Sequence, residues 1–234
     1  QYGDTNATAV VATSERDRLL GMDVGLERER QMLSGFSFAP NVSQWIRPRI
    51  DFGTSYGITR NPNDRTVLRA NDSTGAFRLP RRFNNSQTFS LGASFDIGRA
   101  IVAYTGEGNV LRRIVNVLQP IDVSWNRNLL STFDASPFTP SLGYQFAFGG
   151  SERFRRESGR LATSAGLTRQ LSASGRVALP YGLSLGNRYQ RVDTRNWTRR
   201  VNDTQGVLDG LTTTFPDATL SWSFQPALLR RVFT

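Results

Sequence analysis

Cysteine, histidine and lysine are all missing from this chain of 234 residues. Without cysteine and histidine, these residues cannot form a disulfide, a thiolate nucleophile, an imidazole metal ligand or a histidine general base. Without lysine, the formal net charge of +10 comes entirely from arginine. Arginine offers bidentate contacts to phosphate and carboxylate that lysine does not make.

Apolar residues are also scarce, at 38% of the chain, whereas soluble domains contain roughly 45–50%. Aromatic residues reach 11%, which is not typical of a disordered chain. No run of about 18 apolar residues occurs, so the sequence predicts no transmembrane helix. The chain begins without methionine and in the middle of a pattern, and we expect it to be a segment of a longer protein.

The clearest pattern is the alternation in "RPRIDFGTSYGITR", residues 47–60. Ile50, Phe52, Tyr56 and Ile58 fall on one side, while the other side carries arginine, aspartate, glycine, serine and threonine. Successive side chains of a strand point to opposite faces, so this period of two predicts a strand with one apolar face.

The same alternation predicts further strands, and the motif "LPYG" at 179–182 is short enough to join two of them into a long hairpin. The other clear strands are expected at 88–98, 141–150, 161–179, 181–190 and 217–224. Weaker candidates are 19–27, 33–39, 121–127 and 189–199, and turn-rich stretches are expected at 60–77, 135–140 and 201–210.

Two stretches depart from the period of two. Residues 109–119, "NVLRRIVNVLQ", place apolar side chains at the i, i+3, i+4, i+7 spacing of one helical face, and Pro120 follows. The face of this expected helical insert consists of Leu111, Ile114, Val115 and Leu118. A second helical insert is expected at about 227–233, where "LLRRVF" echoes "VLRRIV".

The medium on each side of the strands decides the class of protein. A soluble sandwich packs its apolar faces together, whereas a membrane strand of about 9–11 residues turns its apolar face to lipid. Long strands and a second face rich in glycine, serine and asparagine favour an all-β chain in which residues 1–234 are part of one antiparallel transmembrane β-barrel. The residues predicted to face lipid are Ile50, Phe52, Tyr56, Ile58, Phe89, Leu91, Phe95, Leu142, Tyr144, Phe146, Phe148, Leu183, Leu185, Leu220 and Trp222.

Arginine pairs and tryptophan near strand ends are typical of membrane boundaries. We expect Trp197, Arg112, Arg113, Arg230 and Arg231 to anchor the chain at the interface with lipid or lipopolysaccharide. The arginines do not form one stripe with aromatic stacking partners, so nucleic-acid binding is disfavoured. No set of catalytic residues emerges, and we expect neither an enzyme nor a bound metal or cofactor.

Two stretches carry a resemblance to a known family. Residues 215–234, "FPDATLSWSFQPALLRRVFT", and residues 110–149, "VLRRIVNVLQPIDVSWNRNLLSTFDASPFTPSLGYQFAFG", combine a strand with a short di-arginine helix. They resemble recurring units of the SprA/Sov family, the giant outer-membrane barrels of the type 9 secretion and gliding-motility system. The resemblance implies a protein-conducting translocon that exports cargo to the cell surface, with periplasmic or plug proteins as partners.

Two alternatives remain open. One is a smaller porin or receptor-type barrel that passes solutes, although simple porins use tight periplasmic turns instead of helical inserts. The other is a soluble β-sandwich that acts as a binding module.

Overall fold

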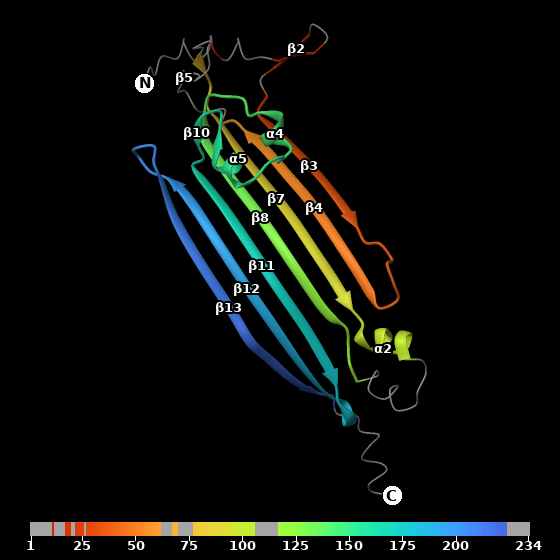
Figure 1. Cartoon of the computed structure of the whole chain (residues 1–234). Coiled ribbons are helices and arrows are strands. Elements are labelled where there is room, and N and C mark those ends of the chain that lie inside the picture. Colours follow the sequence, from red (N-terminus) through yellow and green to blue (C-terminus); the bar gives the residue numbers. More distant parts are fainter. Residues whose placement is uncertain are drawn as a thin grey trace, which may run out of the picture.

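The computed structural model describes residues 11, 17–19, 22–25, 27–61, 67–69, 77–105 and 117–223. Its centre is one antiparallel sheet of seven strands, and within this sheet the spatial order of the strands is the same as their order in the chain (Figure 1). The strands are β3 (Glu29–Phe38), β4 (Ile46–Thr59), β7 (Arg81–Phe95), β8 (Ile121–Ser136), β11 (Ser164–Ala178), β12 (Leu183–Arg199) and β13 (Gln205–Trp222).

The strands are much longer than the five or six residues usual in globular proteins. They run from 10 residues in β3 to 18 residues in β13. The all-β, antiparallel character predicted by the alternation is confirmed. The sheet is open, and β3 and β13 form its two edges.

Register gathers the alternating apolar residues on one face. Ile50 of β4 lies opposite Phe38 of β3 and Leu91 of β7. Leu91 in turn lies opposite Trp125 of β8, and Trp125 lies opposite Leu171 of β11. Because directly opposed residues point to the same side of a sheet, these side chains form a continuous surface, which we call the apolar face.

The intervening residues form a polar face. Asp51 of β4 lies opposite Ser37 and Ser90, and Ser90 lies opposite Asn126, which faces Gln170. A shift of one residue in register would exchange the two faces, so the pattern fixes the pairing.

The hairpin between β11 and β12 is confirmed, with a 3-10 turn, η1 (Pro180–Gly182), at its tip. Tyr181 and Gly182 both have positive φ, of 65° and 77°. A Cβ added to Gly182 would lie 2.3 Å from the carbonyl oxygen of Ser223. Glycine is therefore required where β13 closes onto this turn.

The connection between β8 and β11, residues 137–162, folds back over one end of the apolar face, and we call it the cap. Figure 1 shows its helices in front of one end of β7 and β8. The cap contains α4 (Leu142–Gln145), α5 (Ser151–Arg155), β9 (Arg156–Glu157) and β10 (Arg160–Leu161).

The prediction of a strand at 141–150 is wrong, because this stretch belongs to the cap and begins with α4. The Ser141 hydroxyl accepts a hydrogen bond from the backbone N–H of Tyr144 and begins α4. Ala147 and Gly149 then take positive φ, of 56° and 133°, and reverse the chain. The alternating aromatics arise here from a short helix and a turn that bury Tyr144 completely.

Aromatic side chains from the sheet and the cap form the core. Tyr144 packs edge-on against Tyr56 and Phe133, with ring centroids 6.2 and 5.6 Å apart, and it also contacts Phe154 at 6.1 Å. Such pairs add roughly 0.5–1.5 kcal/mol each beyond the burial of their area. The core therefore lies at the capped end of the sheet and not along its whole length.

The helix predicted at 109–119 falls mostly outside the described residues, and its last part is wrong. Leu118 forms an antiparallel bridge with Val177. The N–H of Gln119 donates to the carbonyl of Arg176, and the N–H of Ala178 donates to the carbonyl of Val117. Strand β11 continues beyond Ser174, its last residue paired with β8. Residues 117–119, which lead into β8, pair with the backbone of this extension.

Other boundaries also differ from the prediction. The helix α2 (Ile97–Thr105) begins where a strand was expected to end at 98, because the carboxylate of Asp96 accepts the N–H of Arg99. Strand β13 begins at Gln205, inside a stretch expected to be a loop. The second helical insert, 227–233, lies outside the described residues.

Four short strands complete the described elements and form two separate two-stranded sheets. They are β1 (Asp17–Leu19) with β2 (Met22–Gly25), and β5 (Leu68–Arg69) with β6 (Phe77–Arg78).

Candidate functional site

The apolar face divides into a zone beneath the cap and an open zone. In the open zone, Leu91, Leu171, Leu185 and Leu220 are 38–67% exposed. We call this open zone the apolar band. It consists of Phe36, Phe38, Ile46, Pro48, Ile50, Phe52, Phe89, Leu91, Ala93, Phe95, Ile121, Val123, Trp125, Leu171, Ala173, Val177, Leu183, Leu185, Tyr189, Ala218, Leu220 and Trp222.

The apolar band has a similar length on several strands. It covers 46–52 on β4, 89–95 on β7 and 171–177 on β11. At a rise of about 3.3 Å per residue, each segment is about 20 Å long. With the polar residue at the boundary included, the segments run from Gln87 to Phe95 on β7 and from Arg169 to Val177 on β11. Each then reaches the lower end of the roughly 9–11 residues that a tilted membrane strand requires.

The boundary of the band nearest the cap crosses the strands obliquely. On the apolar face, the first polar residue between the band and the capped end is Gln87 on β7, Arg127 on β8, Arg169 on β11 and Arg191 on β12. Arg127 lies opposite Phe89 and not opposite Gln87, so the boundary is displaced by two residues between β7 and β8.

The boundary is displaced by another two residues between β11 and β12. Arg191 lies opposite Leu171, which belongs to the band, and not opposite Arg169. The boundary at the other end of the band is displaced in the same direction from β7 to β12. Its last directly opposed pair on β7 and β8 is Phe95 and Ile121, whereas Val177 and Leu185 lie further along β11 and β12. A slanted band follows when strands cross a flat apolar layer at a tilt, as barrel strands do at about 35–45°.

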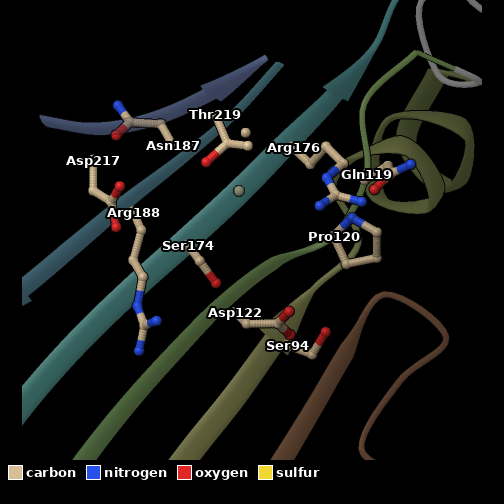
Figure 2. Close-up of a pocket in the computed structure, with 12 residues that line it drawn as sticks. Ser94, Gln119, Pro120, Asp122, Ser174, Arg176, Asn187, Arg188, Asp217 and Thr219 are labelled. Carbon is tan, nitrogen blue, oxygen red and sulfur yellow. The ribbon is translucent and has the colours of Figure 1, made fainter. Parts of the chain in front are cut away.

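The polar face is hollowed in several places. Depressions of about 520, 450 and 320 Å³ lie on it. Figure 2 shows the depression of about 520 Å³, which lies at the end of the sheet away from the cap. The polar side chains labelled there are Ser94, Gln119, Asp122, Ser174, Arg176, Asn187, Arg188, Asp217 and Thr219.

Short side chains and ion pairs give the polar face its hydrophilic character. The hydroxyls of Ser124 and Ser172 lie 2.7 Å apart across β8 and β11. The guanidinium of Arg49 donates to Asp51 at 2.7 Å, and the hydroxyl of Ser37 donates to the same carboxylate at 2.6 Å. Such a surface is well suited to contact with water.

Polar groups of the sheet fasten the cap. The side-chain amide of Asn85 donates to the carbonyl of Tyr144, and that of Gln87 donates to the carbonyl of Ala147 at 2.8 Å. Asn85 and Gln87 are 2% and 8% exposed, so these bonds are shielded from water. Burial raises the pKa of Tyr144, because the phenolate would be poorly solvated there.

Most residues predicted to face lipid lie together in the apolar band. They are Ile50, Phe52, Phe89, Leu91, Phe95, Leu183, Leu185, Leu220 and Trp222. Register thus brings residues of β4, β7, β12 and β13 onto one surface.

The prediction that the remaining side chains line an outer wall of strands is wrong. Tyr56 and Ile58 belong to the apolar face, but they lie beneath the cap and are 0% and 3% exposed. The other four residues belong to the cap itself because the chain leaves the sheet after β8. They are Leu142, Tyr144, Phe146 and Phe148.

Trp197 is not an exposed anchor. It is 5% exposed, and the guanidinium of Arg155 lies over its ring at 5.0 Å from the centroid. The cap therefore covers it, as it covers Tyr56. The other predicted anchors and the first three residues of the predicted helical face lie outside the described residues. They are Arg112, Arg113, Arg230, Arg231, Leu111, Ile114 and Val115.

Sequence reasoning missed the arginines at the boundary. Arg127, Arg169 and Arg191 alternate in phase with apolar neighbours, so each points to the same side as the band. That phase was the available signal, but only the pairing of strands shows that the three arginines lie next to one another.

Comparison of the chain with models of known protein families, with curated proteins and with solved structures found no match. In the part of the chain that the structure describes, no helix is long and apolar enough to cross a membrane. The same residues contain no group of three or more acidic side chains placed to hold a metal ion.

Proposed function

We propose that this chain forms part of the wall of an outer-membrane β-barrel. The observation that carries the proposal is the slanted apolar band opposite a hollowed polar face. In this arrangement the band contacts the hydrocarbon of the membrane, and the polar face lines an aqueous passage. The strands at the capped end extend beyond the band, and the cap lies outside the hydrocarbon.

The open edges of the sheet fit a larger barrel. Unpaired N–H and C=O groups cost several kcal/mol each in hydrocarbon, so a membrane sheet must close on itself. In this proposal further strands pair with β3 and β13 to complete the barrel. The exposed 18-residue β13 offers a long edge for such pairing.

The transported substance is proposed to be protein cargo bound for the cell surface, as the resemblance to the SprA/Sov family implies. A wall of serine, threonine, glycine, asparagine and arginine suits a passage for chains of varied sequence, because short polar side chains form hydrogen bonds with water and with polypeptide backbone alike. Periplasmic or plug proteins would then control the passage. A barrel that passes small solutes is the alternative within the same architecture.

A soluble β-sandwich is the second candidate, and the cap is the observation that favours it. One end of the apolar face already packs against protein, through Tyr56 and Phe83 in the core. In a sandwich a second layer of protein would cover the apolar band as well.

Cell fractionation of the full-length protein tests the proposal. We expect the protein in the outer membrane, resistant to extraction by salt and running at a different gel mobility before and after heating. A salt-soluble protein in the soluble fraction would overturn the barrel and favour the sandwich.

Depletion of the protein then separates protein cargo from solutes. Loss of proteins from the cell surface, with solute uptake unchanged, is the result expected for an export channel. Loss of solute uptake with an intact surface proteome would instead identify a porin or receptor.

A further inference from the structure

Three arginines form a line along the boundary between the apolar band and the capped zone. Arg127 of β8 lies directly opposite Arg169 of β11, and Arg191 of β12 lies opposite Leu171, two residues along the strand from Arg169. All three therefore project from the apolar face on adjacent strands. Arg169 and Arg191 are exposed, and Arg127 is partly buried.

Within the described residues these arginines lack an ion-pair partner. Arg127 and Arg169 lie directly opposite each other. Like charges in this arrangement destabilise an antiparallel pair, so an anion bound between them would be stabilising. The Nε atom of Arg127 is buried and has no hydrogen-bond partner among the described residues.

The two nearest carboxylates in the sheet, those of Asp193 and Asp209, do not neutralise the three arginines. Asp193 lies opposite Arg169 but forms no salt bridge with it. Asp209 is engaged by Arg195 through two hydrogen bonds, of 2.7 and 2.9 Å. The line of three arginines therefore keeps an unmatched positive charge beside an exposed apolar surface.

We propose that Arg127, Arg169 and Arg191 bind the phosphate of an anionic membrane lipid whose acyl chains lie against the apolar band. This inference rests on the proposed membrane function. Planar guanidinium groups bind phosphate oxygens bidentately, and their long stems can lie along apolar surface while the charge reaches the headgroup. Trp125 on β8 and Leu171 on β11 lie two residues further from the cap than Arg127 and Arg169, and they provide apolar surface for the acyl chains.

A phosphate requirement can be tested with two lipids that differ only in that group. The detergent-purified full-length protein is titrated with tritiated dioleoyl phosphatidic acid, and unlabelled phosphatidic acid, dioleoylglycerol or inorganic phosphate is added as competitor. We expect saturable binding that unlabelled phosphatidic acid displaces, and that dioleoylglycerol or inorganic phosphate at the same concentration does not.

The variant changes Arg127→Gln, Arg169→Gln and Arg191→Gln together. We expect its affinity to fall at least about tenfold, because it loses charge-assisted hydrogen bonds. The matched control changes Arg47→Gln, Arg176→Gln and Arg188→Gln on the polar face, which removes the same charge and leaves binding unchanged. A second variant with lysine at the three boundary positions keeps the charge without the planar fork, and an intermediate loss is expected.

Heat-modifiable mobility shows that each variant has folded. Equal binding by the wild-type protein and the folded glutamine variant would overturn the lipid site while leaving the barrel intact. Displacement by inorganic phosphate at the same concentration would show a site for free phosphate and also overturn the assignment to lipid. If fractionation places the protein outside the membrane, the proposed function fails, and the lipid site fails with it.

Discussion

The phenol oxygen of Tyr144 lies 2.7 Å from the hydroxyl oxygen of Ser131, and this contact joins the cap to β8, the central strand of the sheet. Both residues are buried, at 0% and 3% exposure. The contact couples a residue of α4 to a strand that also contributes Trp125 to the apolar band.

We expect Tyr144→Phe to lower the free energy of unfolding by about 1–3 kcal/mol, because Ser131 keeps its place but loses its buried partner. Tyr144→Ala also removes the ring from the aromatic core and should cost about 3–5 kcal/mol. Chemical unfolding in detergent, followed by tryptophan fluorescence, measures both values. Equal stability of all three proteins would show that the cap is not anchored through this residue.

Alkaline pH should loosen the cap through the same side chain. Burial raises the pKa of Tyr144 above its ordinary value of 10.0, so the folded state favours the protonated phenol. The corresponding contribution to stability is fully present below about pH 10 and is lost as the pH rises through the raised pKa of the folded state. Unfolding measured between pH 8 and about pH 12 should show a steeper loss in the wild-type protein than in Tyr144→Phe, and parallel curves would contradict this assignment.

The proposed orientation of the sheet can be tested with adjacent residues of β11. Ala173 lies within the apolar band, whereas Ser174 lines the depression of about 520 Å³ on the polar face. An arginine at the middle of a lipid-facing strand costs about 2–4 kcal/mol, so Ala173→Arg should reduce the yield of heat-modifiable protein in the membrane. Ser174→Arg adds the same charge on the other face and should leave the yield close to that of the wild type. The reverse result would mean that the faces have been assigned the wrong way round.

Quenching by brominated lipid should distinguish the tryptophans of the chain. Trp222 is 65% exposed in the apolar band, whereas Trp197 is 5% exposed beneath Arg155. Two variants that each keep only one of these tryptophans, with phenylalanine at the other three positions, isolate the two signals. After reconstitution we expect strong quenching of Trp222 and little of Trp197, and quenching of Trp197 alone would contradict the position given to the cap.

Alternation alone was sufficient to predict most of the sheet. The strand at 47–60, the hairpin joined by "LPYG" and the common side of Ile50 and Phe52 all follow from a period of two, which is a local property of the backbone. The same reasoning failed at 141–150. Aromatics at alternating positions also occur in a short helix followed by a turn, and only the hydroxyl of Ser141 and the positive φ of Ala147 distinguish the two.

The sequence by itself determined the chemical limits of this protein and the existence of two unlike faces. The absence of cysteine and histidine and the alternation of side chains are properties of each stretch alone. Only the tertiary structure decided which part of the apolar face is covered by the cap, and that Arg127, Arg169 and Arg191 lie side by side. Both facts depend on register and on contacts between residues far apart in the chain, and no local pattern encodes those distances.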